Sequence, residues 1–190
     1  MEDQEEVEGL MVRATERWTL MEHEKDSPES GGGAGARPFS PAWIRRAGAA
    51  DLGAMVRIES RSFSNPWHPR IFRSLITRER AIVLVAEMPE DGVVGYAVSW
   101  WVLEQAELGN IAVREDCRGR GIGSALLDRV LEEIRERGVE SVFLEVRMSN
   151  ARAHALYLAR GFIQIAVRAD YYRNPMEDAR VLVKHLKKHL

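Results

Sequence analysis

The stretch Arg118-Gly119-Arg120-Gly121-Ile122-Gly123 lies between a predicted strand and a predicted helix. Glycines at such a junction leave backbone N–H groups free to converge on an anion, and the dipole of the following helix adds attraction. The stretch indicates a pyrophosphate cradle, although its spacing alone fits an ordinary glycine-rich connection equally well. It does not match the dinucleotide fingerprint Gly-x-Gly-x-x-Gly, because the third glycine would fall on Ser124 or Leu126.

Alternating strand and helix patterns surround this stretch. Helices are expected over 49–62, 69–77, 123–137 and 150–160. Strands are expected around Ile44, from Phe162, and over 81–87, 93–103, 107–113, 139–147 and 179–185. Tyr171-Tyr172 is assigned to the connection before the last strand. This order predicts an α/β fold, layered as helices that flank a mixed central sheet of about seven strands.

Residues 1–41 differ in composition from the rest of the chain. Residues 1–25 are acidic and carry an apolar stripe that predicts an amphipathic helix when docked, made of Val7, Leu10, Met11, Ala14, Trp18 and Met21. Residues 26–41 are rich in Gly, Ser and Pro and are expected to form a flexible linker. A single globular domain is therefore expected over residues 42–190.

Composition narrows the class of protein and its compartment. The single cysteine, Cys117, cannot form an internal disulfide, and the acidic N-terminus does not resemble an export signal, so a cytoplasmic location is expected. No apolar run reaches the length of a membrane span. A mild excess of bases after residue 30 suits phosphate-bearing small ligands but is too small to indicate nucleic-acid binding. The five histidines have no metal-site spacing, and no metal is expected.

With its flanks, the glycine stretch fits Arg/Gln-x-x-Gly-x-Gly/Ala and resembles the signature loop of the GNAT acetyltransferases. Asn110-Ile111-Ala112-Val113 resembles the strand that pairs with the pantetheine arm of acetyl-CoA in that family. The order and spacing of Asn150, Tyr157, Gly161 and Phe162 are also similar. Leu144-Glu145-Val146-Arg147 and Asn65-Pro66-Trp67 resemble the branch that acetylates protein N-termini, especially the bacterial ribosomal-protein-alanine N-acetyltransferases. The resemblance covers about Arg45 to the C-terminus and implies a GNAT fold that uses acetyl-CoA.

The resemblance implies roles for particular residues. The cofactor would contact Asn150 and the two runs Ile111-Ala112-Val113 and Arg118 to Ser124, although Asn150 fits a helix N-cap equally well. Tyr157 would be the acid that protonates the leaving thiolate of CoA, and its spacing alone favours a tyrosine packed in the core.

Glu145 is the predicted base. Strand alternation puts it on the same face as Phe143 and Arg147, near the carboxyl end of its strand, where α/β sheets place their ligands. Without the resemblance, a surface ion pair between Glu145 and Arg147 is the better interpretation. With it, Glu145 takes a proton from the acceptor amine, directly or through water.

Three aromatic residues could line a groove for the acceptor. They are Trp67 and the pair Tyr171-Tyr172; the resemblance implies this role for the tyrosines, and ordinary packing of the aromatic residues is an equal alternative. Two positions depart from the family pattern. Cys117 stands where an aromatic residue is common, and Gly109 stands where a bulkier residue usually precedes the asparagine.

The resulting hypothesis is an acetyl-CoA-dependent enzyme that acetylates the α-amino group of a protein N-terminus, in particular an N-terminal alanine of a ribosomal protein. A GNAT enzyme for a small amine, such as a polyamine, an aminoglycoside or an amino acid, is the first alternative. A CoA-binding regulatory module without turnover, in which residues 1–25 dock a partner, is the second. The oligomeric state is left open.

Overall fold

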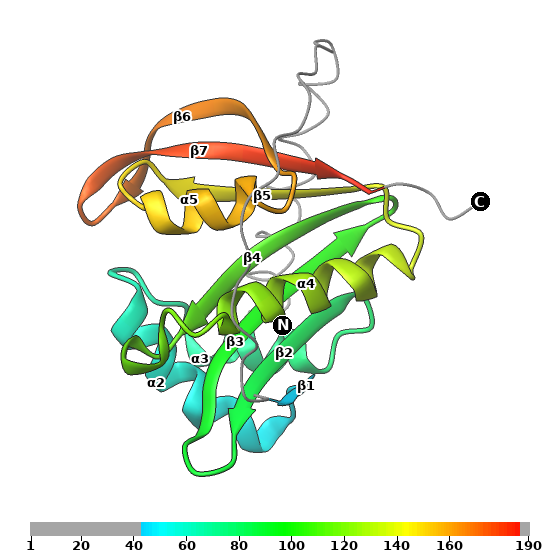
Figure 1. Cartoon of the computed structure of the whole chain (residues 1–190), viewed down its shortest axis with the longest axis vertical. Coiled ribbons are helices and arrows are strands. Elements are labelled where there is room, and N and C mark those ends of the chain that lie inside the picture. The colour runs from blue at the N-terminus through cyan, green and yellow to red at the C-terminus, as the bar shows by residue number, and fades with distance from the viewer. Residues whose placement is uncertain (1–42, 187–190) are drawn as a thin grey trace.

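The computed structural model describes residues 43–186 (Figure 1). The predicted amphipathic segment, residues 1–25, and the predicted linker, residues 26–41, lie outside the described residues. The strands are β1 (Trp43–Arg46), β2 (Ala81–Met88), β3 (Gly92–Val102), β4 (Gln105–Val113), β5 (Ser141–Arg147), β6 (Ile163–Arg173) and β7 (Met176–His185). The α-helices are α2 (Leu52–Ser62), α3 (Pro69–Ile76), α4 (Ile122–Arg135) and α5 (Ala151–Leu158), with short 3-10 helices η1 (Ala49–Asp51) and η2 (Glu115–Cys117).

The strands form one mixed sheet in the order β1-β2-β3-β4-β5-β7-β6. Only β4 and β5 pair in parallel, and the other neighbours among the described strands are antiparallel. Parallel neighbours need a crossover connection, which α4 supplies. The predicted α/β fold with a mixed sheet of about seven strands flanked by helices is confirmed.

Helices cover both faces of the sheet (Figure 1). One buried cluster packs α4 and α5 against the sheet and includes Ile82 and Leu84 of β2, whereas a second cluster packs α2 and α3 against the other face and includes Val83 and Val85. The neighbouring side chains of β2 are therefore buried alternately on opposite faces, as a central strand requires. Between residues 43 and 186, no helix combines the length and apolar character needed to cross a bilayer.

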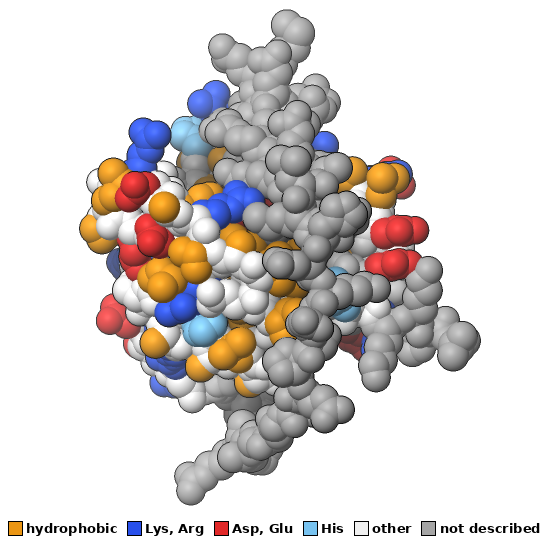
Figure 2. Space-filling view, turned by 90° about the horizontal axis from the view of Figure 1, so that it is seen from above, with side chains coloured by type: hydrophobic (Ala, Val, Ile, Leu, Met, Phe, Trp, Pro, Cys, Tyr) orange, Lys and Arg blue, Asp and Glu red, His pale blue; other side chains and the backbone are white. Residues whose placement is uncertain are grey.

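Strand β6 differs from the sequence prediction. Tyr171 and Tyr172 lie in this strand rather than in the connection before β7, and Tyr172 is opposite Glu177. The prediction was wrong because Asp170, with a positive φ of 52°, interrupts the strand pattern just before the tyrosine pair. A register shift between residues 168 and 172 further obscures the pattern. Figure 2, which looks from above Figure 1, shows hydrophobic side chains scattered among charged ones on this side.

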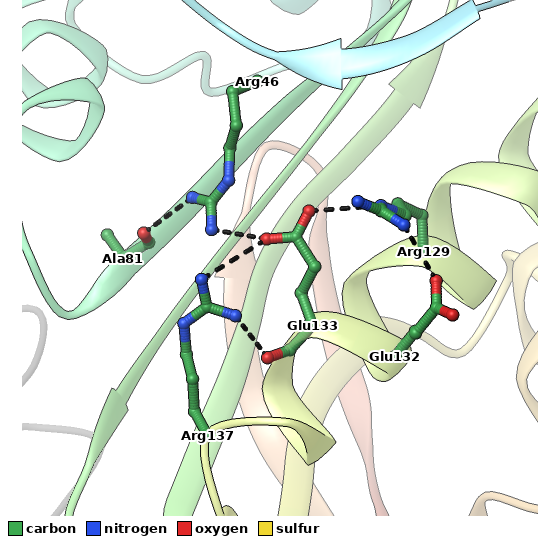
Figure 3. A network of polar contacts seen from close by, with 6 residues as sticks. All are labelled: Arg46, Ala81, Arg129, Glu132, Glu133 and Arg137. Atoms are coloured by element: carbon green, nitrogen blue, oxygen red, sulfur yellow. Dashed lines mark hydrogen bonds and ion pairs between the residues drawn. The ribbon is translucent and has the colours of Figure 1, made fainter.

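Glu133 of α4 pairs with three arginines, and one of them, Arg46, ties the helix to the first strands (Figure 3). Its carboxylate pairs with Arg46 of β1, with Arg129 at 3.2 Å and with Arg137 at 3.6 Å. Arg46 also donates to the Ala81 carbonyl at 3.1 Å. Because Glu133 is buried, these partners replace the water that its charge has lost.

Replacing Glu133 with glutamine should lower the free energy of unfolding by about 2–3 kcal/mol, because one neutral amide cannot satisfy three guanidinium groups. The loss stays moderate because the arginines are partly exposed. Urea denaturation followed by circular dichroism measures it. Glu132→Gln is the matched control, since Glu132 pairs with Arg129 at the surface and should lose less than about 1 kcal/mol. Equal losses in both variants would contradict this role of Glu133.

Candidate active site

The parallel strands β4 and β5 separate soon after they meet. Their pairing covers three positions, from Gln105 opposite Ser141 to Glu107 opposite Phe143. Beyond this point the register of β3 with β4 shifts, and Gly109 is the extra residue that forms the bulge. A bulge bends its strand and increases the local twist. The bent β4 therefore diverges from β5 and leaves an opening between the two strands (Figure 1).

The register directs alternate residues of β4 toward this opening. The backbone N–H of Arg114 donates to the Val94 carbonyl, so the backbone of Arg114 faces β3. In an antiparallel pair, every second residue directs its backbone N–H and C=O toward the partner strand. The backbone groups of Ala112 therefore face β3. Those of Ile111 and Val113 face the opening, and the Val113 carbonyl accepts a hydrogen bond from Arg118 Nε at 2.9 Å.

The glycine-rich loop leads from β4 into the N-terminus of α4. Gly119 and Gly121 adopt left-handed backbone conformations, with φ of 83° and 82°, which disfavour residues with side chains. Gly121 is the N-cap of α4, and no side chain caps this end within the described part of the chain. The first N–H groups of α4 are therefore open to an anion, and Arg118 and Arg120 add positive charge around them.

The residues predicted to hold acetyl-CoA thus form two adjoining parts of one surface. The outward backbone of Ile111 and Val113 suits an amide-bearing chain, and the loop with the α4 N-terminus suits a pyrophosphate. Asn150 caps α5 by accepting the Ala153 N–H at 3.1 Å, so its predicted helix-capping role is present. Its contact with the cofactor stays a prediction.

Glu145 forms an ion pair with Arg168 of β6 at 3.4 Å. The alternative pair between Glu145 and Arg147 is not the one observed, because the Arg147 guanidinium pairs with Glu177 at 3.0 Å. Residues i and i+2 of a strand are about 7 Å apart. Glu145 and Arg147 each form an ion pair with a residue of another strand instead. Glu145 lies two residues beyond Phe143, the last residue of β5 that pairs with β4, so it lies beside the opening.

Tyr172 lies close enough to Glu145 and to Tyr157 to interact electrostatically with each of them, and these three residues are called the electrostatic group below. Burial raises the pKa of Tyr172, the charges of Tyr171 and Glu145 raise it further, Arg147 lowers it, and Tyr157 raises it. Burial also raises the pKa of Tyr157, whose ring packs edge-on against Phe162. The structure therefore brings together both predicted catalytic residues and one predicted acceptor residue.

Glu59 of α2 is a buried carboxylate that the sequence analysis missed. It accepts hydrogen bonds from the Trp67 N–H at 2.8 Å, the Asn110 amide at 3.1 Å and the Tyr96 hydroxyl. Burial raises its pKa, and these hydrogen bonds lower it only in part. Glu59 therefore fastens the segment between α2 and α3 to β3 and to the bulged part of β4.

A sequence signal for Glu59 was present. It lies four residues after Met55 and three after Val56, on the apolar stripe of its helix. A carboxylate on an apolar stripe indicates a buried group that needs hydrogen-bond partners. Those partners lie far away in the sequence, so the fold was needed to identify them.

Trp67 is half-buried and packs against aromatic rings of the core. Its ring lies 5.6 Å from that of Phe72 and 6.0 Å from that of Trp100, measured between centroids. A Cβ on Gly109 would overlap the Trp100 ring and lie 2.7 Å from Trp67. The unusual glycine is therefore required because two indoles cover it. Tyr171 and Tyr172 contact each other at 5.0 Å, and the acceptor groove of all three residues stays a prediction.

Residues 52–162 match the model of the Acetyltransferase (GNAT) family. The chain belongs to this family. The [Ribosomal protein bS18]-alanine N-acetyltransferase of Escherichia coli strain K12 is 38% identical over 131 residues, which are 68% of this chain and 85% of that protein. The putative [ribosomal protein bS18]-alanine N-acetyltransferase of Bacillus subtilis strain 168 is 32% identical over 141 residues, or 73% and 92% of the two chains.

A solved structure agrees with this assignment. The crystal structure of the ribosomal-protein-S18-alanine N-acetyltransferase from Escherichia coli has a TM-score of 0.71 and 34% identity, and the match covers 78% of this chain and 96% of that one. The protein is therefore an acetyl-CoA-dependent N-acetyltransferase. Within residues 43–186, no group of three His, Cys, Asp or Glu side chains is placed to hold a metal ion.

Cys117, the second departure from the GNAT pattern, has a packing role. It is buried in the core cluster beneath α4, and this burial raises the pKa of its thiol. A raised pKa disfavours the thiolate, which is the nucleophilic form of cysteine. The environment of Cys117 therefore favours direct transfer over an acetylated cysteine intermediate.

Gly121→Glu should abolish binding of acetyl-CoA, because it puts a carboxylate at the open N-terminus of α4 where the pyrophosphate would lie. Isothermal titration calorimetry measures the affinity. Gly138→Glu is the control, since Gly138 also has a positive φ, of 77°, but follows the other end of α4. Unchanged affinity in Gly121→Glu would refute the assignment of the loop.

The raised pKa of Glu59 predicts how stability depends on pH. The folded state keeps a proton that the unfolded chain has already lost, so the free energy of unfolding falls as pH rises above about 4.5 and levels off above the folded pKa. Denaturant titrations of the wild type and Glu59→Gln across this range give the difference. The difference should become smaller with rising pH, and a difference that grows would contradict the raised pKa.

Proposed function

We propose that the enzyme transfers the acetyl group of acetyl-CoA to the α-amino group of a protein N-terminus, with the N-terminal alanine of ribosomal protein bS18 as its acceptor. The names of the two relatives at 38% and 32% identity support this acceptor. The observation that carries the proposal is the position of Glu145 beside the opening between β4 and β5, where it pairs with Arg168 and lies near Tyr172. A cytoplasmic location belongs to the same proposal.

Glu145 is proposed to deprotonate the acceptor. An α-amino group has a pKa near 8 and is mostly protonated at neutral pH, whereas only the free amine attacks a thioester. Arg168 lies 3.4 Å from the Glu145 carboxylate and supplies its counter-charge. The amine nitrogen then bonds to the thioester carbon, and its proton passes to Glu145, directly or through water.

Tyr157 is proposed to complete the transfer as the acid. Collapse of the tetrahedral intermediate breaks the carbon–sulfur bond, and the sulfur needs a proton as it leaves. Burial raises the pKa of Tyr157, so its hydroxyl keeps the proton until the thiolate forms. The products are the acetylated amine and free CoA thiol, without a covalent enzyme intermediate.

The acceptor class is tested by the release of CoA thiol with three kinds of amine, followed by mass spectrometry of the products. A peptide that begins with alanine should be acetylated at its N-terminus. The same peptide with a blocked N-terminus should not react, and polyamines or aminoglycosides should react poorly. Preferential acetylation of a small amine would instead make this a small-molecule acetyltransferase, and binding of acetyl-CoA without any turnover would support a regulatory module.

Glu145→Gln should lower kcat by about 10²–10⁴ while acetyl-CoA binding persists, because the amide cannot take the proton. Tyr157→Phe should also lower kcat, since the ring still packs but has no hydroxyl. Steady-state kinetics and calorimetry separate the two effects. Glu136→Gln, at the exposed end of α4, is the control and should behave as wild type. Wild-type turnover of Glu145→Gln at neutral pH would exclude Glu145 as the base.

A further inference from the structure

The Arg147 guanidinium connects two segments that are distant in the sequence. Its Nη2 donates to Ser64 Oγ at 3.1 Å, in the segment between α2 and α3, and to the Asn174 carbonyl at 2.9 Å, in the β6–β7 turn. Its Nη1 donates to the Pro175 carbonyl of the same turn at 3.2 Å. Ser64 also donates directly to the Asn174 carbonyl. One planar side chain thus holds both segments at the end of β5.

Arg147 is itself firmly held. Its Nη1 bonds to Glu177 Oε2 of β7 at 3.0 Å, and its guanidinium carbon lies 4.1 Å from the centre of the Tyr172 ring. Hydrogen bonds from Ser149, followed by the bond from Arg147, hold the pKa of Glu177 below its ordinary value, so this partner is charged at neutral pH. A guanidinium fixed by a carboxylate and a stacked ring keeps its remaining donors in a defined direction.

The position of this contact relates it to the acceptor. Arg147 lies two residues after Glu145 on the same face of β5, about 7 Å further along the strand. Tyr172, on which Arg147 stacks, belongs to the electrostatic group of Glu145 and Tyr157. The segment fixed by Ser64 leads directly to Trp67. The bridge therefore joins the elements that border the Glu145 side of the opening.

We propose that Arg147 is a positioning residue for the acceptor, which holds the 63–68 segment and the β6–β7 turn together and keeps Tyr172 beside Glu145. This inference rests on the proposed function for the identity of the acceptor, but the bridge itself is independent of it. Arg147 does not contact the glycine-rich loop in the contacts described, so it should affect the acceptor and leave acetyl-CoA binding unchanged.

The first test uses the free full-length protein and needs no acceptor. Hydrogen–deuterium exchange should accelerate in both the 63–68 segment and the 173–176 turn of Arg147→Ala, by about tenfold or more, because charged hydrogen bonds to both are lost. Exchange in β2 and β3 should be unchanged. Arg160→Ala is a matched control, since Arg160 also pairs with a carboxylate and its side chain is 22% exposed against 21% for Arg147. Unchanged exchange in either segment would overturn the bridge.

The second test is kinetic and uses the alanine peptide. In Arg147→Ala, KM for the peptide should rise by about tenfold or more, with KM for acetyl-CoA unchanged, and Arg147→Lys should recover little because it lacks the planar fork. Ser64→Ala should show part of the effect and add little to Arg147→Ala, because both act through one contact. Faster exchange with an unchanged peptide KM would overturn the acceptor role. If the wild type acetylates no peptide, the proposed function fails while the exchange test still decides the bridge.

Discussion

The divergence of β4 from β5 is the constraint on which the rest of this structure depends. The two strands share three paired positions, and the bulge at Gly109 follows immediately. Backbone groups left without a neighbouring strand are costly when buried, so they need partners from elsewhere. In β4, the Val113 carbonyl accepts a hydrogen bond from Arg118. The backbone groups of Ile111 face the opening. The same interruption of the ladder that weakens the sheet thus creates a surface able to bind an extended amide-bearing cofactor.

Two buried or half-buried ionic side chains offset the weakness of a sheet that is divided in this way. Glu59 accepts hydrogen bonds from Trp67, Tyr96 and Asn110 and so fastens the segment after α2 to β3 and β4. Arg147, at the end of β5, holds the same segment by donating to Ser64. A charge in such a place is costly unless every donor or acceptor is matched. Hydrogen bonds of defined direction therefore add to the less directional apolar packing of these elements.

The sequence predicted the order and type of the elements because most strands and helices bury one regular face. It also led to the glycine-rich loop, since the left-handed conformations of Gly119 and Gly121 require glycine. It failed where a residue's role depends on contacts distant in the chain. Glu59 was missed because its hydrogen-bond partners come from other elements, and Arg147 resembled the partner of Glu145 two residues away. The bulge at Gly109 was visible only as a departure from the family, because the covering ring of Trp100 comes from the adjacent strand.

The cofactor and the acceptor are expected to bind to different kinds of structure, and family membership therefore says more about the cofactor than about the acceptor. The surface suited to acetyl-CoA consists of strand backbone and a helix N-terminus, which many side-chain changes leave intact. The acceptor side consists of a segment and a turn joined by side chains such as Ser64 and Arg147. Such connections vary more readily than the elements they join. Membership of the family therefore supports acetyl-CoA as the cofactor more directly than it supports any one acceptor.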